Sequence, residues 1–189
     1  KEFRNVHAVR LLLDKGANTE ASNDDLKMLH YACIYGDKDM VKVLLEHNAV
    51  VSSTTKDGKT PLHFACIHGN NEVIKMLLDI GVDIEVKDVR GFTSLHLACQ
   101  AGKKQTVELL LAHGANIDAQ TNSKTTPRYF ALIGAHSDIV KILDEFVENK
   151  RKQLSNMPEQ NDVSSFFQAE IKDFSDDLSF LESGEVDDL

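Results

Sequence analysis

The segment KDGKTPLHFACIHGNNEVIKMLLDIGVDIEVKD, residues 56–88, begins with a turn and the start of a helix. Asp57 and Gly58 favour a tight turn, because aspartate bonds to its own backbone and glycine accepts a positive φ. Thr60 followed by Pro61 is typical of a helix start. A hydroxyl can cap the first free backbone amides, and proline fits the first helical position.

The same segment predicts two short helices, over residues 61–67 and 72–79. Gly81 suits the left-handed residue just past the second helix. The apolar residues of that second helix form one wide face: Val73, Ile74, Met76, Leu77 and Leu78. A turn and two such helices cannot bury this face alone, so the fold requires neighbouring units of the same kind.

Those neighbours are visible as an internal repeat. Four columns of identical residues recur at a spacing of 33: His30, His63 and His96; Ala32, Ala65 and Ala98; Cys33, Cys66 and Cys99; and Gly36, Gly69 and Gly102. A fourth, eroded copy begins with TPRYFA at residues 126–131. Four columns that keep one period indicate a repeat architecture.

The repeated motifs carry a family resemblance. They are TPLHFA (residues 60–65), TSLHLA (93–98), and the helix endings LLLDKGA (11–17) and LLLAHGA (109–115). With a period of 33, residues 4–148 resemble the ankyrin repeat. The resemblance implies an all-α solenoid in which each repeat is a β-turn finger followed by two antiparallel helices. It also implies a concave surface that binds a protein partner.

The period gives the domain boundaries. We predict a partial repeat, its second helix only, at 1–22, three complete repeats at 23–55, 56–88 and 89–121, a capping repeat at 122–150, a linker at 151–164, and an acidic amphipathic helical tail at 165–189. A half-repeat exposes the face that its partner would cover, so we expect further repeats upstream of residue 1.

Some positions depart from the repeat. Asn48 replaces the glycine that ends a second helix, a position that asparagine tolerates. Gly16 and His30 are 14 residues apart, whereas the next two copies have 15, so we expect a first finger that is one residue short. Arg128 and Asp144 replace leucines in the last copy, which predicts a polar cap.

The charge is concentrated at the end of the chain. The formal net charge is −9, and residues 159–189 hold ten acidic residues and one basic residue, so the rest is neutral. A neutral body argues against direct nucleic-acid binding.

The acidic tail also contains the signals of an amphipathic helix. Ser165 and Gln168 fit a capping box. An apolar stripe then predicts a docking helix: Phe167, Ile171, Phe174, Leu178 and Leu181.

The tail leaves several interpretations open. It could dock on its own solenoid or on a neighbouring copy, which would give self-association. It could split into two helices near Ser175. It could instead recruit a partner in trans, as an activation-type helix of a transcription-linked or signalling regulator. The third alternative is an acidic tail that only keeps the protein soluble. The solenoid could also be the substrate-recruiting part of a larger enzyme or a pathogen effector.

The residue types that could bind a metal or act in catalysis do not form a recognisable site in the sequence. His63, Cys66 and His68 resemble a small metal cluster, but His63 and Cys66 belong to repeated columns, so we predict no metal and no cofactor. The sequence contains no nucleophile-elbow motif of a hydrolase, no phosphate-binding loop and no zinc-protease motif, so we predict no enzyme.

The sequence also bears on localisation. No apolar run is long enough to span a membrane. Three unpaired cysteines favour a reducing compartment: the cytoplasm, with the nucleus as alternative.

The partner-binding positions follow from the resemblance. On the finger tips and the exposed sides of the first helices they mix apolar groups with a rim of charge, as interaction sites do. They are Leu26, Ile34, Tyr35, Lys56, Asp57, Lys59, Ile67, His68, Val89, Arg90, Phe92, Gln100, Ser123, Thr125 and Ile133. The alternative is that some of them pack between neighbouring fingers as core.

Overall fold

The computed structural model describes residues 5–155. The sequence forms short helices and a single two-stranded hairpin within that range: α1 (Val6–Asp14), β1 (Ser22–Asn23), β2 (Leu26–Lys27), α2 (Met28–Tyr35), α3 (Lys38–Glu46), α4 (Pro61–His68), α5 (Asn71–Asp79), α6 (Ser94–Gln100), α7 (Lys104–Ala112), α8 (Pro127–Ile133) and α9 (Ser137–Ser155). The predicted linker after residue 155 and the acidic tail lie outside the described residues.

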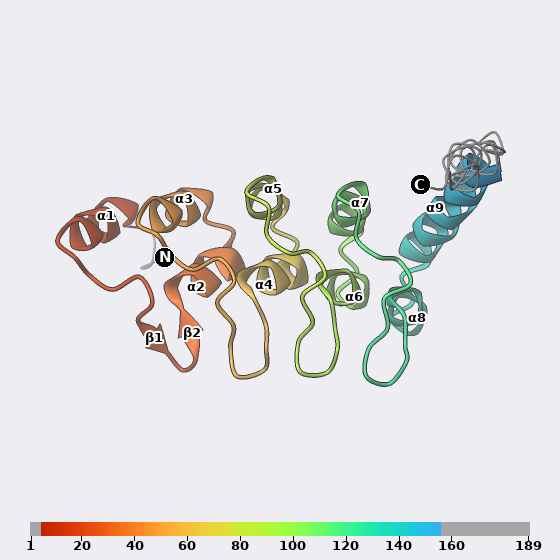
Figure 1. Cartoon of the computed structure of the whole chain (residues 1–189), viewed down its shortest axis with the longest axis horizontal. Helices are drawn as coiled ribbons and strands as arrows, with labels where there is room; N and C mark the ends of the chain where they lie inside the picture. Colours follow the sequence, from red (N-terminus) through yellow and green to blue (C-terminus); the bar gives the residue numbers. More distant parts are fainter. Residues whose placement is uncertain (1–4, 156–189) are drawn as a thin grey trace, which may run out of the picture. The chain divides into compact units, whose positions relative to one another are not determined.

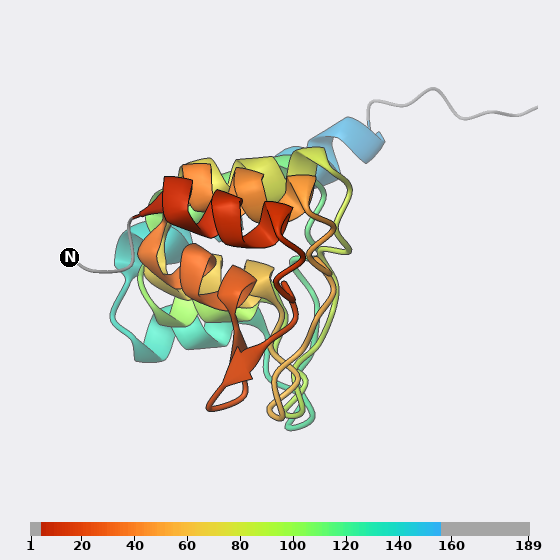
Figure 2. The same ribbon diagram turned by 90° about the vertical axis from the view of Figure 1, so that its left-hand side faces the viewer.

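The helices up to Val147 form one compact unit built as a two-row stack. The inner row holds α2, α4, α6 and α8, and the outer row holds α1, α3, α5, α7 and the beginning of α9 (Figure 1). Within the pairs, α2 packs on α3, α4 on α5 and α6 on α7. Neighbouring helices also pack on one another along the inner row from α2 to α8 and along the outer row from α1 to α7. Seen along the stack, the finger loops lie behind one another on one side (Figure 2). The predicted all-α repeat solenoid is confirmed.

The predicted helix signals act as expected. Thr60 is the N-cap of α4, and its side chain accepts a hydrogen bond from the His63 backbone amide at 3.4 Å. Gly81 follows α5 with a φ of 81°. Asn48 has a φ of 60°, so the asparagine takes the left-handed conformation that glycine has in the other repeats.

The first finger differs from the others, as its length predicts. Strands β1 and β2 pair in an antiparallel register, Asn23 opposite Leu26, around a two-residue tip. Asp24 and Asp25 both have positive φ, at 49° and 75°, as a tight hairpin turn requires. The second finger has a longer tip with glycine at its left-handed residue, Gly58. Removing one residue therefore converts the finger into a tighter hairpin.

Lys124 takes the left-handed place of Gly58 in the fourth finger, with a φ of 61°. A side chain with a Cβ atom costs about 1–2 kcal/mol in this region. We expect Lys124→Gly to stabilise the array by about 0.5–1 kcal/mol, because the relief of strain exceeds the extra entropy of the unfolded chain. Urea unfolding measures the change. Ser123→Gly, at a neighbouring position without positive φ, should instead lower stability.

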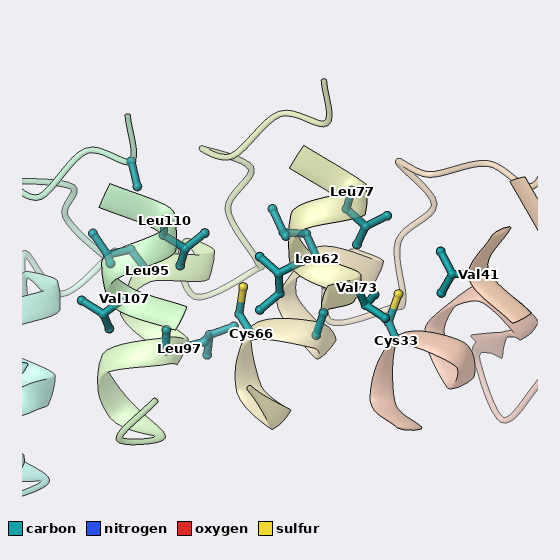
Figure 3. Packing of buried hydrophobic residues seen from close by; sticks show 14 of the residues in the cluster. Cys33, Val41, Leu62, Cys66, Val73, Leu77, Leu95, Leu97, Val107 and Leu110 are labelled. Atoms are coloured by element: carbon teal, nitrogen blue, oxygen red, sulfur yellow. The ribbon is translucent and has the colours of Figure 1, made fainter. Parts of the chain in front are cut away.

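The core is continuous from repeat to repeat. Cys33, Cys66 and Cys99 have no solvent exposure, and Figure 3 shows Cys33 and Cys66 pointing into the aliphatic core. Burial raises the pKa of the Cys33 and Cys99 thiols to about 12, and raises that of Cys66 as well. All three are free thiols that act as small apolar side chains.

The last helix is longer than the repeat predicts. We predict a linker from residue 151, but α9 continues through Ser155. That part of the prediction is wrong, because residues 148–155 contain no glycine or proline to end the helix. Lys150, Arg151 and Lys152 also favour a helix near its C-terminal end, where positive charge complements the helix dipole.

Candidate functional site

A ladder of buried histidines holds the finger loops in place. His30, His63 and His96 have no solvent exposure. Each Nδ1 accepts a hydrogen bond from the backbone amide three residues earlier, at 3.0–3.1 Å. Because Nδ1 is an acceptor, the proton resides on Nε2, which donates to a carbonyl of the following finger loop. These carbonyls belong to Ser53, Phe92 and Thr125.

This ladder fixes each turn and links each repeat to the next. Burial lowers the pKa of all three histidines, so their neutral form is favoured. For His63, the charges of Asp88 and Lys59 act in opposite directions. Among residues 5–155, no group of three or more His, Cys, Asp or Glu side chains is placed to hold a metal ion.

The finger tips are joined by hydrogen bonds from one repeat to the next. The Val89 amide donates to the Asp57 carbonyl at 2.9 Å, and the Asn122 amide donates to the Arg90 carbonyl at 3.0 Å. The Asn122 side chain also donates to the Val89 carbonyl at 3.0 Å. In the first finger, the Asp25 carboxylate accepts from the Lys56 amide instead. The tips thus form one connected strip.

The predicted partner-binding residues divide by exposure. Those with exposed side chains lie on the tips or at the C-terminal ends of inner helices: Lys56, Asp57, Val89, Arg90 and Ser123 on the tips, and Tyr35, His68, Gln100 and Ile133 on the helices. Val89, Tyr35 and Ile133 are each about 60 % exposed. A second group is half-buried: Leu26, Ile34, Lys59, Ile67 and Thr125.

Phe92 requires a correction. We predict it to be exposed, but it is only 8 % exposed. Its ring lies 4.7 Å from that of Phe130 and 5.7 Å from that of His96, measured between centroids. Phe92 ends the third finger, where its ring fills the space between that finger and the next inner helix. It therefore belongs to the core and cannot contact a partner.

Arg90 is held in a defined orientation at the third tip. Its guanidinium lies 4.4 Å above the Phe92 ring and 3.5 Å from an Asp88 carboxylate oxygen. The Asp88 side chain is fully buried and accepts bonds from the Arg90 and Phe92 amides, each at 2.9 Å. The Arg90 side chain remains 56 % exposed, so it presents a preoriented positive charge to solvent.

Comparison with known protein families agrees with the repeat fold seen in the structure. The family described as ankyrin repeats (three copies) matches residues 2–88 and, a second time, residues 81–153. The chain belongs to the ankyrin-repeat family. Ankyrin repeats are generally protein–protein interaction modules. A comparison with curated protein sequences finds no match. Within residues 5–155, no helix has both the length and the apolar character needed to cross a bilayer.

The last ankyrin repeat contains features that the sequence only half reveals. Arg128 and Asp144, predicted as a polar cap, form a two-point ion pair with distances of 2.7 and 3.0 Å. Hydrogen bonding to Arg128 lowers the pKa of the Asp144 carboxyl. Tyr129 and Leu132 on the same helix are 47 % and 50 % exposed. Neither residue is among the predicted site residues, although both lie in repeat columns, Tyr129 in that of His30 and Leu132 in that of Cys33.

Proposed function

We propose that this chain is a protein-binding module that takes a protein partner on the concave surface of its ankyrin solenoid. That surface consists of the connected finger tips and the exposed C-terminal ends of the inner helices. Membership of the family supports a binding role, and the positions that vary between repeats support this location. The chain needs no cofactor for this function.

One observation carries the proposal. The histidine, alanine and cysteine columns are buried, whereas the exposed tip positions change chemistry from repeat to repeat: Lys56 in the second finger, Val89 and Arg90 in the third, and Ser123 in the fourth. Because the tips are bonded to one another, these side chains are presented in a fixed order. A rigid row of differing side chains can recognise an extended protein surface with little loss of entropy.

Apolar anchors accompany the charged groups. Tyr35 and Val89 are exposed by 59 % and 60 %. Aromatic and aliphatic anchors beside arginine are typical of the residues that dominate protein interfaces. We expect Arg90 to serve as a second anchor, because Asp88 and Phe92 already hold it in place and binding would immobilise it at low entropic cost.

Affinity capture followed by titration of the purified partner tests this assignment. Tyr35→Ala combined with Val89→Ala should weaken binding at least tenfold, because each truncation removes a contact anchor. The matched control is Ile80→Ala, since Ile80 is an apolar residue of 53 % exposure just after the outer helix α5. Equal affinity of the double variant and the intact chain would refute the assignment. Thermal melting of all three proteins confirms that they are folded.

A further inference from the structure

The last repeat leaves an apolar face uncovered in the described part of the chain. In the interior repeats, the residues facing the next repeat are buried: the His30 column, the Cys33 column and the Val41 column are all without exposure where a repeat follows. Cys66, for example, contacts Ser94 of α6. We call the equivalent positions of the last repeat the end face: Tyr129 and Leu132 on α8 and Val140 on α9.

The end face has kept its apolar character. Tyr129 is 47 % exposed and Leu132 is 50 % exposed, and Val140 is half-buried. At the Cys33 position, the small thiol has been replaced by the larger leucine rather than by a polar group. A repeat that only had to face water would have polar residues there. The enlarged apolar surface therefore indicates a contact.

The polar substitutions border this face instead of covering it. Arg128 and Asp144 replace leucines that are buried or half-buried in the interior repeats, and they neutralise each other in an ion pair. An exposed ion pair contributes little stability by itself. Its effect is to exclude another ankyrin repeat, which would need apolar residues at both positions. The end face therefore suits a narrower occupant than a full repeat.

We propose that the end face is the docking site of the chain's own acidic segment, residues 165–181. That segment carries five apolar residues at spacings of 4, 3, 4 and 3, which predicts one helical stripe. A single amphipathic helix laid on α8 and α9 would bury Tyr129, Leu132 and Val140, as the next repeat does for the interior columns. The inference goes beyond partner binding on the concave surface and does not depend on it.

The chain is long enough for this return. Helix α9 has 19 residues, which corresponds to about 28 Å at 1.5 Å per residue. Residues 156–164 separate its end from the acidic segment, and nine extended residues reach about 30 Å. The connection is therefore long enough for the segment to reach α8. A tether of this length also gives a local concentration in the millimolar range.

Amide hydrogen exchange of the full chain tests the proposal. In the intact protein, the amides of residues 167–181 should exchange at least tenfold more slowly than those of an unstructured peptide. Leu132→Glu should abolish this protection, because docking would then bury a carboxylate against the apolar stripe at a large cost in free energy. Ile80→Glu, the matched control with 53 % exposure, should leave it unchanged. Tail amides that exchange at unstructured rates in the intact protein would overturn the proposal.

A second variant addresses the same contact from the side of the acidic segment. Phe174→Ser should make Tyr129 more accessible to a soluble quencher in a chain with Tyr31→Phe and Tyr35→Phe, which leaves Tyr129 as the single tyrosine of a protein without tryptophan. Unchanged quenching would contradict docking on the end face. Loss of tail protection in the Tyr35→Ala variant, but not in Leu132→Glu, would place the tail on the concave surface. Protection that depends on concentration, with a dimeric mass, would assign the end face to a second copy.

Discussion

Lowering the pH from 7 to 5 should destabilise the ankyrin array by a few kcal/mol, mainly through the three buried histidines. An exposed histidine has a pKa of about 6.5, and burial lowers the pKa of His30, His63 and His96 in the folded chain. The unfolded chain therefore binds more protons below pH 6.5. Each histidine can contribute up to about 1.4 kcal/mol per pH unit in this window.

The direction of this change in stability follows from the hydrogen bonds of the histidine rings. Each Nδ1 accepts from a backbone amide, so a proton there would face another proton and break the bond that begins an inner helix. Stability is thus highest above the unfolded pKa and falls as the pH drops below it. His47 acts in the opposite direction, since its bonds to the Val43 carbonyl and to Asp14 raise its pKa. Its contribution is present at low pH and is lost as the pH rises.

Urea unfolding at pH 7, 6 and 5 measures this effect, with the lower limit chosen so that ordinary carboxyls stay ionised. The control is His63→Gln, which removes one of the three buried titrating groups. The variant will be less stable at every pH, but its free energy of unfolding should change with pH by about one third less. An identical pH dependence in the two proteins would show that the buried histidines are not responsible.

The repeat columns made most of the fold predictable from the sequence. A spacing of 33 aligns His63, Cys66 and Gly69 with their equivalents, so each conserved column reports one environment several times. The prediction that Asn48 adopts the left-handed conformation is confirmed by its φ of 60°. Local chemistry decides such features, because a cap or a turn depends on residues within one helical turn.

Contacts between repeats were harder to predict. Phe92 lies in a finger, where no hydrophobic period shows on which side a ring will pack, and it is buried against Phe130, 38 positions later in the chain. The ion pair of Arg128 and Asp144 also joins residues from two helices. Each of these outcomes depends on where a distant segment lies. The sequence pattern predicts which positions depart from the repeat, but it does not predict the residues that they contact.

Gly91→Ala should be far more destabilising than Gly81→Ala, although both glycines have a φ of 81°. The alanine strain of about 1–2 kcal/mol is common to both sites. A Cβ atom at Gly81 would meet nothing within 4 Å, whereas one at Gly91 would lie 2.6 Å from the backbone nitrogen of Asn122. Backbone cannot move aside as a flexible side chain can. We therefore expect losses of about 1 kcal/mol for Gly81→Ala and about 3 kcal/mol for Gly91→Ala.

The additional loss has a specific physical source. To accept the Cβ atom, the third and fourth fingers must separate, which breaks the bond from the Asn122 amide to the Arg90 carbonyl and the bond from its side chain to Val89. Two such bonds contribute about 1–3 kcal/mol together. Urea unfolding at pH 7 gives both free energies. Equal losses would mean that the tips are not coupled, and would remove the rigid row of side chains on which partner recognition is proposed to depend.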